Sequence, residues 1–399
     1  MPGKNYHTVF YFLLSLSLYS CGQRPHEDID YIGKDTKTIP IDILNYKSAD
    51  FNDLFKIEKI IKLAGNDSVI IGQIDKINYS DNKFYVLDGK TNYIDVFDTT
   101  GRFLFKVSSI GEGKFNYFRV ADFDVDDANQ LIYVLDDYKR KLIVFSGKDG
   151  RPLEEKPLFD FTVNKFALDN NGKTCQLIYS RGGTAESRDN WYNLLVTDSA
   201  NTILYHWLPY TSTASFIMSP EHPLQKTKER ISYLPPFSGT IFGLNDDHTL
   251  SARYVLQFHG AGNGFEKMEA DLRSNAPKTV NDFLHYLDEN NCIKFLNYLE
   301  TDSLLYIYYS TARQGNQFLI YDKNKDSSTL LLSTLQNNYL NLGQPSAVFK
   351  NQFIFVLQPD SFLDKKKIKT QLSLKDQQLF DDFGSGNNPM LVLLKPKSF

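Results

Sequence analysis

A sixteen-residue pattern occurs twice in this 399-residue chain, and the repetition limits the possible folds more than any other feature. Residues 83–98 read KFYVLDGKTNYIDVFD and residues 131–146 read LIYVLDDYKRKLIVFS, so Tyr-Val-Leu-Asp and the later Val-Phe both return after 48 residues. Each copy has two short apolar runs, a polar link between them and a following turn that ends in Gly101 or Gly150, which is typical of consecutive antiparallel strands. A fixed period of this length indicates a series of small sheets.

Weaker copies of the unit continue along the chain. Strands are expected over residues 163–180, 238–244, 292–309 and 346–357. Phe (30) and Tyr (24) far outnumber Met (4) and Trp (2), which also favours strands over helices. Six units of about four strands each, roughly 40 to 65 residues apart, have the spacing of propeller blades. We therefore predict an all-β fold, a six-bladed β-propeller.

Two apolar runs near the ends of the chain are placed to close the ring. A closed ring leaves no open sheet edge when strands from both ends share one blade. FKIEKIIKL at Phe55–Leu63 and LVLL at Leu391–Leu394 are predicted to pair in this way, so that one domain covers residues 51–399.

One segment has helical rather than strand spacing. In Thr279–Glu289, the residues Val280, Phe283, Leu284 and Leu287 follow the i, i+3, i+4, i+7 pattern. Thr279 and Asp282 have the spacing of a capping box. We expect a short inserted helix whose apolar side packs on the rim of the propeller itself.

The N-terminus has the features of an export signal. Lys4 precedes an apolar run over residues 9–19, and Cys21 follows Leu18-Tyr19-Ser20, a sequence that resembles the lipobox of bacterial lipoproteins. The run is shorter than the roughly 20 residues of a membrane-spanning helix. We predict a lipoprotein signal peptide over residues 1–20, lipid attachment at Cys21 and a flexible tether over residues 21–50. The alternative is an ordinary signal peptide beside a chance cysteine.

Charge and cysteine content exclude some classes of function. A net charge of −4 and a pI near 6.0, without a stripe of Lys and Arg among aromatics, argue against nucleic-acid binding. Three cysteines are too few for a disulfide framework, and Cys175 and Cys292 lie in apolar surroundings where we expect them to be buried. No Gly-x-Ser-x-Gly elbow or other catalytic constellation is present, so no catalytic residue is assigned.

Two long loops are expected to carry a binding surface. Residues 181–191 and 218–237 combine basic, histidine and aromatic side chains, the types that contribute most to binding contacts. The candidate ligand-binding residues are Arg181, Arg188, Trp191, His222, Arg230 and Tyr233.

Three alternating aspartates are weak candidates for a metal site. Asp122, Asp124 and Asp126 project to one side of an expected innermost strand, where carboxylates could bind Ca²⁺. One strand supplies too few converging ligands, and the equivalent strand IDKINY at residues 74–79 lacks the triplet. A polar channel wall is the simpler interpretation, and no cofactor is assigned.

Taken with FKIEKIIKL, YVLD, IDVFDTTGRFLFKV and the closing NPMLVLL, the chain resembles the six-bladed β-propeller lipoproteins of Bacteroidetes, which are similar in architecture to NHL-repeat and TolB-like propellers. It departs from them at residues 111–117, GEGKFNY, where relatives tend to have Gly-x-Gly-Pro-Gly-Glu-Tyr. The resemblance implies a lipid-anchored protein of the cell envelope, in the outer membrane, and carries no settled activity. We expect a non-enzymatic module that binds a protein, peptide or glycan. The alternative is a metal-dependent hydrolase or lyase with its site on the central channel.

Overall fold

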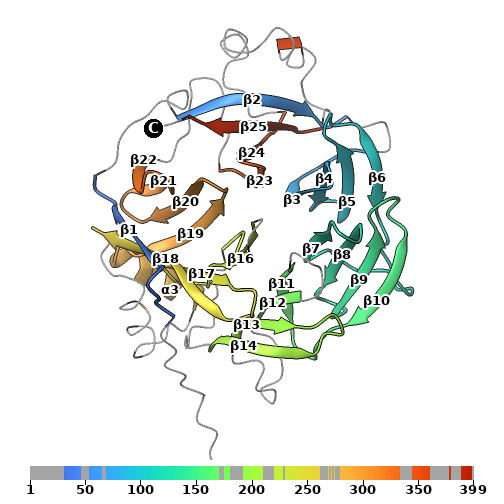
Figure 1. The fold of residues 1–399 in the computed structure, drawn as a ribbon, viewed down its shortest axis with the longest axis horizontal. Helices are drawn as coiled ribbons and strands as arrows, with labels where there is room; N and C mark the ends of the chain where they lie inside the picture. The colour runs from blue at the N-terminus through green and yellow to red at the C-terminus, as the bar shows by residue number, and fades with distance from the viewer. Residues whose placement is uncertain are drawn as a thin grey trace, which may run out of the picture.

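Six small sheets surround a common axis in the computed structural model (Figure 1). The structure describes residues 31–45, 54–64, 69–169, 175–179, 192–209, 220–227, 230–260, 279–332, 344–359 and 388–397, with residues 268, 271, 274, 377 and 378. Every sheet has four or five strands, so the predicted six-bladed β-propeller is confirmed.

The blades follow one another along the chain, and each blade runs from an innermost strand near the axis to an outermost strand. In that order, the first three blades are β3 (Ile74–Ser80), β4 (Lys83–Asp88), β5 (Tyr93–Asp98) and β6 (Phe103–Val107); β7 (Asp122–Asp126), β8 (Leu131–Asp136), β9 (Lys141–Ser146) and β10 (Pro152–Pro157); β11 (Val163–Leu168), β12 (Cys175–Tyr179), β13 (Tyr192–Thr197) and β14 (Ile203–Pro209). The last three are β15 (Leu224–Lys226), β16 (Ile231–Tyr233), β17 (Thr240–Leu244), β18 (Leu250–His259) and β1 (Lys37–Asp42); β19 (Ile293–Glu300), β20 (Leu304–Thr311), β21 (Gly315–Asp322) and β22 (Ser327–Leu332); β23 (Ala347–Phe349), β24 (Gln352–Leu357), β25 (Met390–Pro396) and β2 (Phe55–Lys62).

The hydrophobic core lies between the blades rather than on the axis. Six separate clusters of buried side chains each join two neighbouring blades. Between the first two blades, for example, Val96 and Phe123 are both fully buried. Because each blade buries both faces against its neighbours, the stability of every blade depends on a complete ring.

The ring closes through an N-terminal strand, as predicted. β2 is the outermost strand of the last blade and pairs antiparallel with the C-terminal β25, from Phe55 opposite Pro396 to Lys62 opposite Met390. Its buried residues Phe55, Ile60 and Ile61 contribute to the clusters on both sides of this blade.

The expected flexible tether over residues 21–50 is wrong for its second half. β1 pairs in parallel with β18 and forms a fifth, outermost strand of the fourth blade. Ile39, Ile41 and Ile43 alternate along this segment and are at most 1% exposed, packed between the fourth and fifth blades. Only three side chains are buried, so the run is too short for strand periodicity to be evident among its polar neighbours.

The repeated Tyr-Val-Leu-Asp motif has a structural role at its aspartate. Asp88 accepts hydrogen bonds from the backbone N–H groups of Gln73 (2.9 Å) and Lys90 (3.0 Å). Asp136 does the same for Phe118 (2.8 Å) and Tyr138 (3.0 Å). Each fully buried carboxylate thereby ties the segment entering its blade to the turn between the second and third strands.

The innermost strands of neighbouring blades run in the same direction. Lys76 and the Phe166 N–H both bind Asp122, and two residues further along each strand Asn78 and the Leu168 N–H both bind Asp124. The bonded residues move forward by two positions on all three strands together, which shows that β3, β7 and β11 run parallel to one another. The innermost strands of the first three blades therefore begin at one end of the ring, and the repeated blade topology orients the other three in the same way.

The two ends of the ring differ in the length of their connections. At the end where the innermost strands finish, consecutive strands are separated by only two to six residues; we call this the short-turn end. At the other, long-connection end, six connections contain 12 to 33 residues, namely those after β6, β12, β14, β18, β22 and β24. Long insertions on one face of a rigid scaffold are typical of a functional face.

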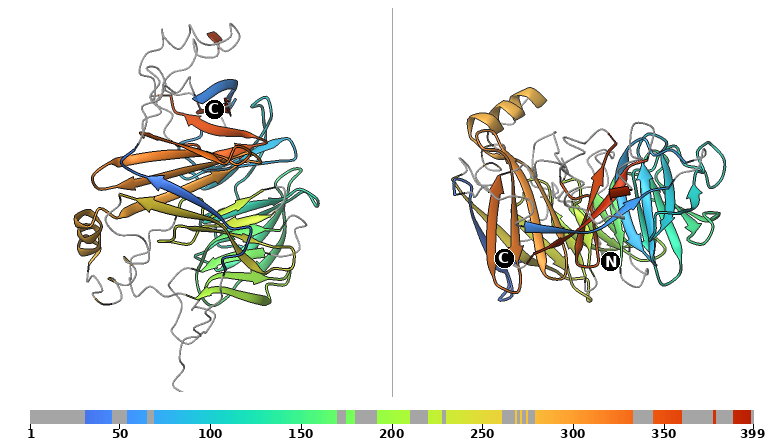
Figure 2. Two further views of the ribbon diagram at one scale, coloured as in Figure 1. Left: turned by 60° about the vertical axis from the view of Figure 1, so that its left-hand side comes forward. Right: turned by 90° about the horizontal axis from the view of Figure 1, so that it is seen from above.

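The predicted helix is present at the long-connection end. α3 (Val280–Glu289) projects from one face of the ring (Figure 2). Thr279 caps it, and the capping box with Asp282 is formed. Phe283 and Leu287 are buried against Cys292, while Val280 and Leu284 remain 51% and 36% exposed, so only half of the apolar stripe packs on the propeller. Within the described residues, no helix is long and apolar enough to span a bilayer.

Candidate functional site

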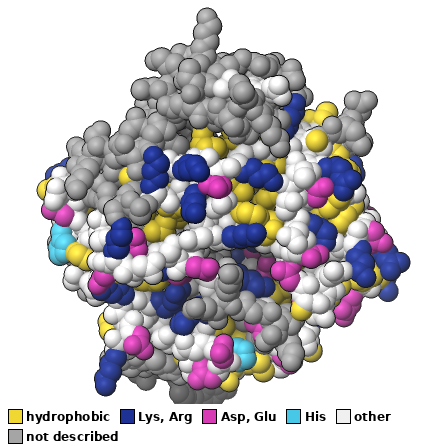
Figure 3. Space-filling view, turned by 45° about the horizontal axis from the view of Figure 1, so that its top comes forward, with side chains coloured by type: hydrophobic (Ala, Val, Ile, Leu, Met, Phe, Trp, Pro, Cys, Tyr) yellow, Lys and Arg dark blue, Asp and Glu magenta, His cyan; other side chains and the backbone are white. Residues whose placement is uncertain are grey.

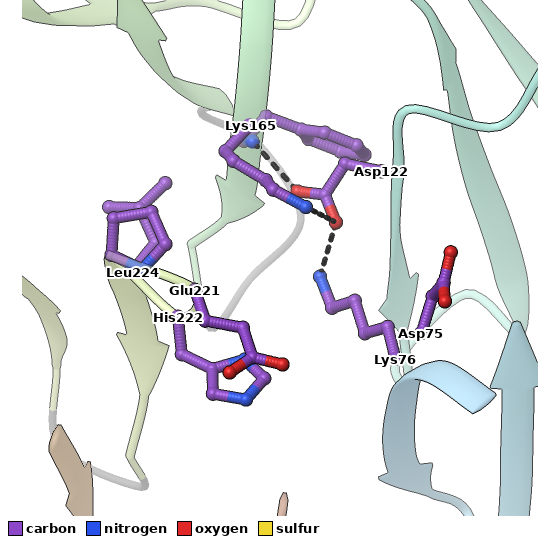
Figure 4. Close-up of a pocket in the computed structure, with 9 residues that line it drawn as sticks. Asp75, Lys76, Asp122, Lys165, Glu221, His222 and Leu224 are labelled. Atoms are coloured by element: carbon purple, nitrogen blue, oxygen red, sulfur yellow. Dashed lines mark hydrogen bonds and ion pairs between the residues drawn. The ribbon is translucent and has the colours of Figure 1, made fainter. Parts of the chain in front are cut away.

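A pocket opens on the axis at the long-connection end. It is open to solvent, and its cavity volume is about 30 Å³, well below the range of about 300–1,000 Å³ for small-molecule sites. Three innermost strands and the segment before β15 form its wall (Figure 4), with the lining residues Asp75, Lys76, Asp122, Lys165, Phe166, Glu221, His222, Pro223 and Leu224.

One wall of the pocket carries two lysines around one buried aspartate. Lys76 Nζ lies 2.7 Å from Asp122 Oδ1, and Lys165 Nζ lies 4.0 Å from the same oxygen. The Asp122 side chain is only 2% exposed, and the Phe166 N–H donates to its Oδ2 at 3.0 Å. Burial alone would raise the pKa of Asp122, but the two ammonium groups and these hydrogen bonds lower it, so the carboxylate is ionised.

The opposite wall carries Glu221 and His222, which face the lysines across the gap (Figure 4). Gln344 donates to the Glu221 carboxylate at 2.7 Å, and the Glu221 N–H donates to Asn297 at 2.6 Å. These contacts join the segment before β15 to the fifth and sixth blades. Burial of the carboxylate, with Asp75 nearby, raises the pKa of Glu221.

His222 is a neutral imidazole at ordinary pH. Its burial and the positive charges of Lys76 and Lys165 lower its pKa to about 4. In the described part of the chain, neither ring nitrogen has a hydrogen-bond partner. The ring therefore offers one donor and one acceptor to the pocket.

The three aspartates of β7 do not converge on a metal site. Asp122 and Asp124 bind the neighbouring innermost strands, and Asp126 accepts from the Asn129 side chain at 2.8 Å. All three are at most 6% exposed. Among the residues that the structure describes, no group of three or more His, Cys, Asp or Glu side chains is placed to hold a metal ion. Asp122 and Asp124 join adjacent blades, and Asp126 holds the turn that follows its own strand.

The predicted binding residues are not brought together. His222 lines the pocket, but Arg230 lies in the β15–β16 turn at the short-turn end, where its carbonyl accepts from Thr227. Tyr233 lies in β16 and is 1% exposed in the core. The expected long loop over residues 218–237 is thus wrong, because it contains β15 and β16, the first two strands of the fourth blade, with three residues each. Cys21, Arg181, Arg188 and Trp191 lie outside the described residues.

Lys76, Lys165 and Glu221 were missed from the sequence. Lys76 and Lys165 each occupy the third position of an innermost strand. A comparison of polar residues at alternating positions of the expected innermost strands would have placed both lysines beside Asp122. Glu221 could not be found by this comparison, because it precedes β15, and a strand of three residues is too short to be recognised from its alternation.

A second buried group of charges lies away from the pocket, between the fourth and fifth blades. Arg253 of β18 donates to both oxygens of Glu300, at 2.7 and 2.8 Å, and Lys323 donates to the same carboxylate at 2.6 Å. The Glu300 side chain is fully buried. Burial alone would raise the pKa of Glu300, but Arg253 and Lys323 hold it below its ordinary value. The geometry is that of a structural ion pair.

On the face drawn in Figure 3, basic and acidic side chains are interspersed rather than gathered by sign. This distribution gives no continuous basic surface on that face of the kind that tracks a phosphate backbone.

Comparisons with known proteins agree with the ring geometry. A family model described as a six-bladed β-propeller, DUF5128, matches residues 33–356. The chain belongs to this family. The match begins before β1, so this strand lies inside the DUF5128 region rather than in a preceding segment.

Two solved structures share the fold of this DUF5128 protein. A candidate exported protein of Bacteroides fragilis has a TM-score of 0.77 at 18% identity, over 91% of this chain and 100% of that one. A DUF4221 member from Bacteroides vulgatus has a TM-score of 0.55 at 9% identity, over 88% and 100%. Comparison with curated proteins gives no match. These similarities show the fold alone.

Proposed function

We propose that this protein is a non-enzymatic binding module of the bacterial cell envelope, anchored to the outer membrane through lipidated Cys21, which binds a protein, peptide or glycan at its long-connection end. The observation that carries the proposal is the contrast between the two ends of the ring. The pocket, helix α3 and the six connections of 12 to 33 residues named above belong to one end. At the other end the described strands are joined by turns of two to six residues, apart from residues 43–54, which cross from the end of β1 to the start of β2.

The N-terminal segment favours one orientation on the membrane. The Tyr31 carbonyl accepts a hydrogen bond from Ala252, close to the β17–β18 turn at the short-turn end. Cys21 precedes Tyr31 by ten residues, which span at most about 35 Å when fully extended. A lipid on Cys21 would therefore hold the short-turn end near the bilayer and leave the pocket facing away from it. The description of the Bacteroides fragilis protein as a candidate exported protein supports an envelope location.

Depth-dependent fluorescence quenching tests both the anchor and the orientation. One label is placed by Lys325→Cys, an exposed site in the β21–β22 turn at the short-turn end, and the other by Tyr138→Cys, 74% exposed at the long-connection end. With the lipidated protein in vesicles, quencher-bearing lipids should quench the label at 325 more strongly than the label at 138. The parent chain gives the labelling background.

Equal or reversed quenching would contradict the orientation. Palmitate labelling that is unchanged by Cys21→Ala would contradict the anchor.

A further inference from the structure

Some of the hydrogen-bond donors on the lysine side of the pocket have no acceptor among the described residues. Lys76 donates to Asp122 (2.7 Å) and to the Phe123 carbonyl (2.8 Å), which leaves one of its three N–H groups. Among the described residues, Lys165 donates only to the Ala121 carbonyl, at 3.3 Å, and it is beyond hydrogen-bond distance of Asp122. Both oxygens of Asp122 are occupied. The lysine wall thus has spare donors facing the pocket, whereas its one carboxylate is buried and already accepts a hydrogen bond at each oxygen.

The charges of this wall do not cancel. Two ammonium groups lie within 4.0 Å of one carboxylate oxygen, so this wall has one more positive than negative charge, while Asp75 and Glu221 bring carboxylates to the rest of the lining. Lys76 and Lys165 are 25% and 35% exposed, so both remain accessible from the pocket. A cationic ligand would be repelled by the lysines, and a dianion would meet Asp122 and Glu221 at close range. The two ammonium groups can therefore hold one carboxylate between them, and Asp75 and Glu221 elsewhere in the lining disfavour a second negative charge.

The remaining lining determines the rest of the ligand. His222 offers one donor and one acceptor, and Glu221 offers acceptors, so neutral hydroxyl or amide groups fit opposite the lysines. Pro223 and Leu224 supply apolar surface beside these polar groups.

We infer that the axial pocket is a binding site for a small organic monocarboxylate, whose carboxylate bridges Lys76 and Lys165 and whose hydroxyl or amide groups bind His222 and Glu221. Two sources share this chemistry, an acidic sugar and the free C-terminus of a peptide. The inference rests on the proposed function in that it names the ligand of the binding end.

Titration calorimetry on the purified full chain tests the inference with matched probes. D-glucuronate is compared with D-glucose, and N-acetyl-Ala-Ala with its C-terminal amide; inorganic phosphate serves as the dianion. We expect at least one carboxylate to bind about tenfold more tightly than its neutral counterpart, a difference of about 1.4 kcal/mol, and phosphate to bind more weakly than that carboxylate. The carboxylate that binds identifies the source.

Lys165→Gln is the decisive variant, because Lys165 is part-exposed and its loss leaves Asp122 paired with Lys76. It should weaken carboxylate binding about tenfold. Lys148→Gln makes the same chemical change at an exposed site between β9 and β10 at the short-turn end, and should have no effect. Thermal unfolding of both variants confirms that each is folded.

Three results would overturn the inference: no carboxylate binding up to about 10 mM, equal binding of the neutral counterparts, or unchanged binding in Lys165→Gln. Titration in solution depends on neither the lipid nor the orientation. A failed titration with the expected quenching pattern would refute the ligand class alone, whereas carboxylate binding without that pattern would refute the anchoring proposal alone.

Discussion

Ile41→Ala should destabilise the whole propeller, although Ile41 lies in a segment that looks like a linker in the sequence. Its side chain is 1% exposed and packs between the fourth and fifth blades, in a cluster that includes Tyr254 and Ile307. Truncating a fully buried isoleucine to alanine costs about 2–5 kcal/mol, from lost burial and the remaining cavity. β1 is an outermost strand and can partly collapse onto β18 when the side chain is shortened. We therefore expect the free energy of unfolding to fall by about 2–3 kcal/mol, in the lower half of this range.

Urea unfolding of the chain from residue 22 onward, followed by fluorescence and circular dichroism, measures this loss. The matched control is Leu44→Ala, which removes a similar side chain three residues later that is 62% exposed; its effect should stay within about 0.5 kcal/mol. The midpoint should shift without a change in the slope of free energy against urea. If Ile41→Ala and Leu44→Ala have equal effects, β1 is not part of the cooperative unit and the tether predicted from the sequence is correct.

Three further predictions concern the ring, the buried ion pair and the repeat. A chain that starts at residue 65 lacks β2, so it should aggregate or lose cooperative thermal unfolding; a transition equal to that of the chain from residue 22 would show that the ring closes elsewhere. Arg253→Met leaves Glu300 without its bidentate partner and should cost about 3–5 kcal/mol in urea unfolding. Since the pKa of Glu300 is lowered on folding, its contribution is present above its unfolded pKa and lost as pH falls through the folded value; Glu300→Gln should flatten the acid side of the stability curve, and an unchanged acid side would contradict this. Asp136→Ala removes the acceptor of three backbone N–H groups, those of Phe118, Tyr138 and Lys139, and should cost about 2 kcal/mol or more in urea unfolding, while Asp149→Ala in an exposed turn should be nearly neutral.

The fold could be predicted because its constraints are local and repeated. Tyr-Val-Leu-Asp marks the second strand of two blades, and in both its aspartate ties the segment that enters the blade to the turn beside it. The α3 cap could be predicted for the same reason, since Thr279 and Asp282 satisfy each other's backbone N–H groups within three residues.

The parts that escaped prediction depend on partners distant in the sequence. β1 is a strand only because β18, more than two hundred residues later, offers an open edge. β15 and β16 pair over three residues each, which is below the length at which alternation can be recognised, and their stability comes from the neighbouring strands of the fourth blade. The sequence around Tyr233 therefore indicates a loop, although this side chain is buried between the third and fourth blades.

The pocket lies where the repeat is weakest. Where innermost strands are complete, as in β3, β7 and β11, their polar groups bind one another, so both oxygens of Asp122 and of Asp124 already accept hydrogen bonds from neighbouring strands. β15 is only three residues long, and the chain before it turns toward the axis, where Glu221 reaches the fifth and sixth blades and His222 keeps both ring nitrogens unpaired among the described residues. Local departures from a regular pattern cost stability and are retained most often at functional sites. On this reasoning the lysines of the first and third blades supply the charge, and the interrupted fourth blade supplies the space and the specificity.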